Sequence, residues 1–173
     1  MCIRDMLVSS VDGVGTKLKV AFSAKRHYTI GQDLVNHCVN DIAVIGAEPL
    51  FFLDYIGTGK LQKKAFTDIV RGFAIGCREN NCSLVGGETA QMPGFYQPGE
   101  YDVSGTIVGV VEKNRILDGS TVRPGDKIIG IAASGLHTNG SSAMTAFLKG
   151  HQSCRWEMST HGENANTSPA ELR

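Results

Sequence analysis

The chain has 173 residues, and its 17 basic side chains balance 17 acidic ones, which gives no electrostatic reason to expect nucleic-acid or membrane binding. Apolar residues form 42% of the chain, but no apolar run approaches the roughly 18 residues that span a bilayer. The first residues lack the apolar core of a signal peptide. The five cysteines form no CxxC pair, which argues against a disulfide or zinc framework and favours the cytoplasm.

The first part of the chain predicts alternating strands and helices. Residues 6–11 have the apolar pattern of a strand, and the segment 17–24 fits either a strand or a helix. A helix is expected from about Gln32 to Ile45, where a glycine and then a proline end it. Residues 50–56 are continuously apolar, which predicts a strand buried on both faces.

The same patterns continue through the rest of the chain. The expected elements are an amphipathic helix over 63–81, a short strand over 82–87, a loop over 88–101, strands over 102–112 and 127–134, and a helix over 141–149. Residues 150–173 are polar without periodicity, so we interpret them as a disordered tail. Because strands and helices alternate irregularly, the sequence favours an α+β domain with a mixed sheet over a doubly wound fold.

The helix expected after Gln32 carries a polar stripe. Its members recur at i, i+3, i+4, i+7 and i+8, and they are Asp33, Asn36, His37, Asn40 and Asp41. A solvated helix face usually carries good helix formers such as Lys and Glu, whereas Asp and Asn are poor ones. The stripe is therefore either an ordinary solvated face or an oxygen-rich surface of the kind that hard cations accept.

Further carboxylates lie at turns and strand ends. Asp12 precedes a glycine turn, Glu88 follows two glycines, and Asp54 lies near the end of an apolar strand. Each position alone is more often structural. Together with Asp41 they would suit Mg²⁺, which proteins hold with one or two carboxylates plus substrate phosphates.

Two glycine-rich loops could bind phosphate. The stretch DGVGTK, residues 12–17, does not have the spacing of a Walker A loop, and its Asp-Gly pair is also a strong hairpin signal. A glycine turn beside Lys17 can still hold phosphate through backbone N–H groups. The second loop, residues 133–140, contains Ser134, His137, Thr138 and Asn139 before a helix, so it is either a phosphate site or an ordinary helix cap.

Several motifs together resemble one family. They are DGVGTKL, IGQDLVNHCVNDIAVIGAEPLFFLDY, NCSLVGGETAQMPG, GEYDVSG and SGLHTNG, and they lie between about Leu7 and Lys149. These motifs resemble aminoimidazole ribonucleotide synthetases, the phosphoribosylformylglycinamidine cyclo-ligases. The resemblance implies an ATP-dependent and Mg²⁺-dependent cyclisation of formylglycinamidine ribonucleotide to aminoimidazole ribonucleotide in de novo purine biosynthesis. It also implies the family's mixed-sheet ATP-binding domain.

The resemblance implies roles for individual residues. The metal would be held by Asp12, Asp41 and Glu88, and Asp41 and His137 would be catalytic. The nucleotide would be bound by Asp12, Gly13, Gly15, Thr16, Lys17, Asp33 and Asn40. The substrate would be bound by Ser134, His137 and Asn139.

The resemblance also implies an organisation. Residues 1–115 would be the N-terminal ATP-binding and dimerisation domain, 116–149 the opening strand, loop and helix of an incomplete second domain, and 150–173 a segment foreign to the family. A homodimer through the N-terminal sheet is expected. Family members have an earlier segment with an ATP-contacting lysine. We therefore expect this chain, taken alone, to turn over substrate poorly or not at all.

Two other interpretations remain open. One is a related ATP-binding enzyme, such as a selenophosphate synthetase or a thiamine-phosphate kinase, although GEYDVSG and GGETAQMPG argue against it. The other is a non-catalytic module that dimerises or binds nucleotide. Val11 and Gln91 stand where family members often carry threonine and glutamate.

Overall fold

The computed structural model describes residues 5–133 and 135–150. The chain divides into two compact units, Met1–Ser142 and Ala143–Arg173. In chain order the elements are β1 (Asp5–Gly13), α1 (Lys17–Ala24), α2 (Tyr28–Ala43), β2 (Glu48–Thr58), α3 (Lys63–Glu79), β3 (Ser83–Gln91), β4 (Tyr101–Glu112), the 3₁₀ turn Lys113–Arg115 and α4 (Ser141–Gly150). The described residues of the second unit continue α4, and the predicted tail after residue 150 lies outside the described residues.

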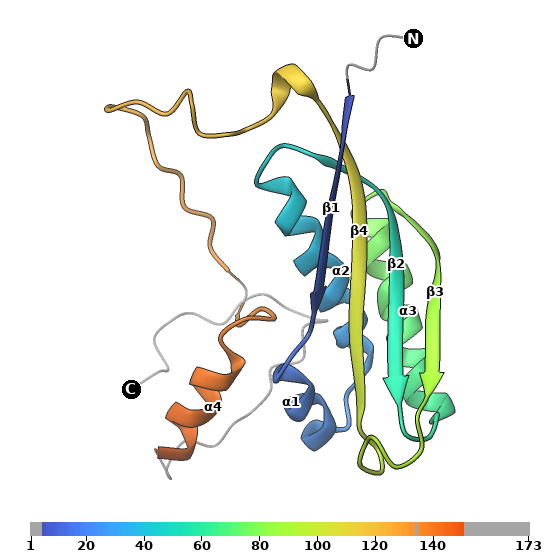
Figure 1. Cartoon of the computed structure of the whole chain (residues 1–173). Helices are drawn as coiled ribbons and strands as arrows, with labels where there is room; N and C mark the ends of the chain where they lie inside the picture. Colours follow the sequence, from blue (N-terminus) through green and yellow to red (C-terminus); the bar gives the residue numbers. More distant parts are fainter. Residues whose placement is uncertain (1–4, 134, 151–173) are drawn as a thin grey trace. The chain divides into compact units, whose positions relative to one another are not determined.

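The first unit is built on a four-stranded mixed sheet in the order β1-β4-β2-β3. Strand β4 pairs antiparallel with both β1 and β2, whereas β2 and β3 are parallel. A parallel pair needs a crossover, and α3 supplies it. The predicted α+β class with a mixed sheet is therefore confirmed, and Figure 1 shows α2 and α3 together behind the strands.

The core lies between one face of the sheet and helices α2 and α3. Strand β4 alternates, so Val103, Ile107 and Val111 are buried against the helices. Phe52 of β2 and Phe73 of α3 are fully buried, with ring centroids 5.9 Å apart. This packing fixes α2 beside β1, where the polar stripe of the helix becomes part of a site.

The opposite face of the sheet is not covered by any described helix, and we name it the open face. Leu7 is 73% exposed, Val11 66% and Val85 57%, and Leu53 of the central strand β2 is 37% exposed. The prediction that residues 50–56 are buried on both faces is therefore wrong for the single chain. The reason is that, among the described elements, helices cover one side of the sheet, so Phe52 and Ile56 of β2 are buried while Leu53 is exposed.

Several predicted boundaries change in the structure. The ambiguous segment 17–24 is helix α1, and α2 begins at Tyr28 rather than near Gln32. Strand β3 continues to Gln91 through residues predicted as loop, because Gln91 pairs with Thr58 at the end of β2. Such pairing depends on a segment distant in the sequence.

The strand predicted over residues 127–134 is wrong for the part of it that the structure describes, residues 127–133. Ile128 is 100% exposed and Ile131 93% exposed. A strand needs a neighbouring strand for its hydrogen bonds, and no described segment pairs with these residues. The helix predicted after them is present as α4. No helix in the described parts of the chain is long and apolar enough to cross a membrane.

Candidate active site

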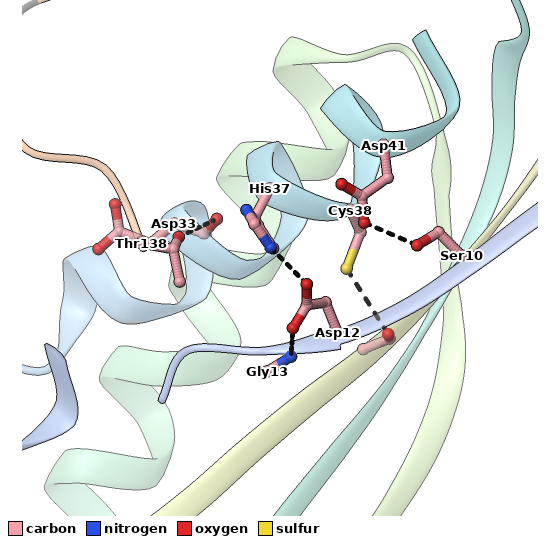
Figure 2. A network of polar contacts seen from close by, with 9 residues as sticks. Ser10, Asp12, Gly13, Asp33, His37, Cys38, Asp41 and Thr138 are labelled. Carbon is pink, nitrogen blue, oxygen red and sulfur yellow. Dashed lines mark hydrogen bonds and ion pairs between the residues drawn. The ribbon is translucent and has the colours of Figure 1, made fainter. Parts of the chain in front are cut away.

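Three side chains meet where the end of β1 lies against α2, and we name them the Asp12 cluster: Asp12, His37 and Asp41. One potential ligand atom from each lies within 4.8 Å of the others. The His37 Nε2 and Asp12 Oδ2 atoms are 2.6 Å apart, and the Ser10 hydroxyl donates a hydrogen bond of 2.7 Å to Asp41 Oδ2 (Figure 2). The cluster therefore joins two rigid elements through direct polar contacts.

The local structure explains why these residues meet. Side chains alternate along β1, so Ser10 and Asp12 share the face turned to α2, while Val11 points to the open face. On α2, His37 and Asp41 are one helical turn apart and share the stripe that faces β1. The Cys38 thiol donates to the Gly105 carbonyl oxygen of β4 at 3.6 Å, which helps to seat the helix on the sheet.

The surroundings of the cluster shift the pKa values of two groups in opposite directions. The Gly13 N–H donates to Asp12 Oδ1 at 2.7 Å, and this bond, with the His37 contact, holds the pKa of the Asp12 carboxyl below its ordinary value. Asp12 is thus a carboxylate at neutral pH. By contrast, burial raises the pKa of the Cys38 thiol to about 12, so this sulfur stays protonated and is a poor metal ligand.

The DGVGTK stretch connects β1 to α1, so the hairpin interpretation is wrong and the stretch is a strand-to-helix turn. Gly15 has a φ of +66°, in the left-handed region that favours glycine. The Thr16 and Ser142 hydroxyl oxygens are 2.6 Å apart. The predicted Gly13, Gly15, Thr16 and Lys17 therefore lie directly after Asp12 on one turn.

Lys17 is already paired with a predicted nucleotide-binding residue. Its Nζ atom lies 2.7 Å from Asp33 Oδ2, and both side chains are 22% exposed. The buried Oδ2 atom has no aligned hydrogen bond in the described residues, so the contact is an ion pair without hydrogen-bond geometry. Thr138 donates a hydrogen bond of 3.5 Å to the Asp33 carbonyl oxygen, which brings the second glycine loop to the same end of α2.

The family model that matches the chain is that of the AIR synthase-related protein, N-terminal domain, and it covers residues 2–111. The chain belongs to this family. A phosphoribosylformylglycinamidine cyclo-ligase of Anaeromyxobacter sp. (strain Fw109-5) is 61% identical over 147 residues, which are 84% of this chain and 43% of that protein. The chain thus spans less than half of that relative.

Solved structures share the fold of this AIR synthase-related domain. The T. maritima PurL structure, complexed with AMPPCP, matches with a TM-score of 0.56 at 21% identity, over 70% of this chain and 19% of that one. A thiamine-monophosphate kinase from Stenotrophomonas maltophilia K279a also gives a TM-score of 0.56 at 21% identity, over 68% of this chain and 34% of that one.

Other predicted site residues of this AIR synthase-related domain lie apart from the cluster. Glu88 is exposed on β3, at the sheet edge opposite β1, and is not a member of the Asp12 cluster. Asn40 is exposed on α2. His137 and Asn139 are exposed in the second loop, and Ser134 lies outside the described residues. The predicted roles of these residues stay predictions.

Two residues that contact the carboxylates of the Asp12 cluster, His37 and Ser10, were not given a role in the sequence analysis. His37 was recognised as part of the polar stripe but not as a ligand. Ser10 precedes Asp12 by two positions, so the strand period would have placed both side chains on one face. The donors present, namely two carboxylates and one imidazole, fit a divalent cation.

Proposed function

We propose that this chain is the ATP-binding part of a phosphoribosylformylglycinamidine cyclo-ligase. The complete protein would close the imidazole ring of aminoimidazole ribonucleotide in purine biosynthesis, in the cytoplasm. The observation that carries the proposal is the pair of carboxylates, Asp12 and Asp41, held together beside a glycine turn in a chain 61% identical to such a ligase. At 21% identity, the thiamine-monophosphate kinase supports a common fold rather than a common activity.

The proposed cyclisation has two steps. The formyl amide oxygen of the substrate attacks the γ-phosphorus of ATP, and ADP leaves. An amidine nitrogen then attacks the activated carbon and gives up a proton, the carbon–oxygen bond breaks, and inorganic phosphate departs with that oxygen. The protein's main tasks in such chemistry are to position the reactants and to balance phosphate charge.

Asp12 and Asp41 would hold Mg²⁺, which would neutralise charge on the transferring phosphoryl group. Ser10 fixes Asp41, and the Gly13 N–H fixes Asp12, so both carboxylates are oriented before any ligand arrives. Among the described residues, Asp41 Oδ1 has no hydrogen-bond partner, so it is available to a cation. Glu88 lies at the far edge of the sheet, so as a metal ligand it would not share one ion with Asp12 and Asp41 of the same chain.

The turn after Asp12 would bind the triphosphate. The AMPPCP in the T. maritima PurL structure, which has this fold, supports nucleotide binding here. Lys17 would contribute its positive charge, and its present partner Asp33 would release it or share it. Asn40 would add a nucleotide contact, while Ser134, His137 and Asn139 would bind the ribonucleotide substrate, with His137 near the reacting atoms.

Product formation by the complete protein that contains this chain tests the proposal. Aminoimidazole ribonucleotide should appear only with ATP, Mg²⁺ and formylglycinamidine ribonucleotide present. Asp41→Asn should lower the rate at least about a hundredfold, because it removes a carboxylate next to the transferring phosphoryl group. The matched control is Asp126→Asn, since Asp126 accepts a bond from the Arg123 N–H in a loop far from β1 in sequence. No product with the unaltered protein, or equal rates for both variants, would refute the proposal.

A further inference from the structure

The Asp12 cluster contains an imidazole for which the proposed reaction has no use. The His37 side chain is 13% exposed, and its Nε2 atom lies 2.6 Å from the Asp12 carboxylate. Its approach is set by α2, whose neighbouring residues Leu34, Val35 and Cys38 are fully buried. The His37 side chain is therefore held in a fixed position rather than free to move in solvent.

We propose that His37 is a third ligand of the metal position, so that this site prefers a first-row transition cation such as Mn²⁺ to Mg²⁺. The inference rests on the proposed function in that it uses the same metal position. It differs in naming a nitrogen ligand and a metal preference, neither of which the carboxylates alone would give.

The spacing of the cluster suits one cation. Two atoms bound to a single ion at about 2.1 Å cannot lie more than about 4.2 Å apart. One potential ligand atom from each of the three side chains already lies within 4.8 Å of the others, and a cation would replace the present 2.6 Å contact between His37 Nε2 and Asp12 Oδ2. Small side-chain rotations would therefore complete the coordination without moving β1 or α2.

The chemistry of the ligand atoms determines which cation the site binds more tightly. Mg²⁺ prefers oxygen ligands and gives up its water reluctantly, so an imidazole adds little to its binding. Imidazole suits first-row transition metals, while carboxylates remain good ligands for Mn²⁺. The mixed set of Asp12, His37 and Asp41 should therefore raise affinity for Mn²⁺ selectively. Cys38 is next in sequence, but its protonated thiol is engaged with the Gly105 carbonyl oxygen.

A different role for His37 would be to orient Asp12 through the same contact. The two roles make separate predictions. A positioning residue should affect all metals that Asp12 binds to a similar extent, whereas a ligand should affect Mn²⁺ far more than Mg²⁺. Only a ligand brings its nitrogen into direct contact with the metal.

The experiment uses the 173-residue chain with the metal ions alone. Mn²⁺ binding is followed by electron paramagnetic resonance, Mg²⁺ binding by competition, and directly bound nitrogen by pulsed resonance on protein with ¹⁵N-labelled histidine. His37→Gln can keep an N–H donor near the position of Nε2 for Asp12 but removes the imidazole. The matched control is Asn36→Ala, on the same helix, which removes a 2.7 Å hydrogen bond to Asn80 outside the cluster.

The unaltered chain should bind Mn²⁺ at least about tenfold more tightly than Mg²⁺ and show a histidine nitrogen signal. His37→Gln should lose that signal and about tenfold in Mn²⁺ affinity, with Mg²⁺ affinity changed less than about twofold. Asn36→Ala should match the unaltered chain.

Absence of the nitrogen signal, a parallel loss of both metals, or failure of the unaltered chain to bind Mn²⁺ would overturn the inference. The proposed function fails separately, since it depends on product formation by the complete protein and on Asp41. A site that binds Mg²⁺ through oxygen alone would refute the role of His37 while leaving the cyclo-ligase proposal intact.

Discussion

At the scale of single residues, the site depends on hydrogen bonds that orient its carboxylates. Asp12 accepts a bond from the Gly13 N–H, and Asp41 accepts one from the Ser10 hydroxyl. The sequence predicted the two carboxylates from their positions at a glycine turn and on a helix stripe. It did not reveal Ser10 or His37 as their partners, because that contact depends on the register in which β1 passes α2.

Ser10→Ala should weaken Mg²⁺ or Mg-ATP binding by roughly tenfold, which is the lower end for loss of a residue that orients a metal ligand. The hydroxyl that fixes Asp41 is lost, while the small side chain leaves packing nearly unchanged. Titration calorimetry measures the affinity. Ser9→Ala is the control, because Ser9 is exposed on the opposite face of the same strand. Equal affinities for the two variants would show that Ser10 does not position Asp41.

His27 should make the free energy of unfolding depend on pH, and this effect is separate from the candidate active site. Its Nδ1 atom is 2.9 Å from the Tyr101 hydroxyl oxygen, and partial burial lowers the pKa of the imidazole, opposed by Asp68 and assisted by Lys64. A histidine whose folded pKa is depressed stabilises the fold above its unfolded pKa, near 6.5, and this stability is lost as pH falls through the folded value.

The free energy of unfolding should therefore fall as pH drops below about 6.5. His27→Gln should flatten this part of the profile, because glutamine can bond to Tyr101 but does not titrate. Urea unfolding between neutral and mildly acidic pH measures the effect. A profile with unchanged slope in His27→Gln would assign the pH dependence to other groups.

At the scale of elements, the sequence predicted what local periodicity controls. The amphipathic helix α3 and the long strand β4 are close to their expected ranges, since apolar residues at helical or alternating spacing determine them. The sequence did not predict strand boundaries that depend on pairing with a strand distant in the sequence. The extension of β3 to Gln91 requires β2, and the strand predicted from residue 127 has no partner among the described segments.

The contact between α2 and α3 is also a property of elements rather than of single side chains. Gly31 of α2 and Gly72 of α3 let the two backbones approach closely. A Cβ atom at Gly31 would overlap the Ile69 carbonyl oxygen and the Phe73 amide nitrogen, and these are backbone atoms that cannot rotate away. The same close approach holds α2 at the depth that places its polar stripe against β1.

Gly31→Ala should destabilise the fold by about 1–3 kcal/mol through overpacking, although alanine has the higher helix propensity. Asn40→Ala on the exposed side of the same helix is the stability control, and it should be neutral or slightly stabilising. Chemical unfolding of both variants measures the difference. A Gly31→Ala protein as stable as the control would mean that the helices can separate without loss.

At the scale of the whole molecule, the open face of the sheet needs explanation. Exposed apolar side chains come from several strands, and they are Leu7 and Val11 of β1, Leu53 of β2 and Val85 of β3. Monomeric proteins rarely expose large continuous apolar patches, so such a face indicates an interface. The sequence predicted a homodimer through this sheet because its strands carry too many apolar residues for one covered face.

We therefore expect a homodimer at micromolar concentration, with the open sheet faces of two chains in contact. Leu53→Lys should shift it to monomer, because a charge in the middle of that face would be buried against apolar groups without a partner. The fold itself should persist, since this position is exposed in the single chain. Val122→Lys is the control, because Val122 is 72% exposed in the segment after β4, outside the sheet. Sedimentation velocity separates the two states. A monomeric unaltered chain would contradict the interface, and a dimeric Leu53→Lys protein would place the contact elsewhere on the molecule.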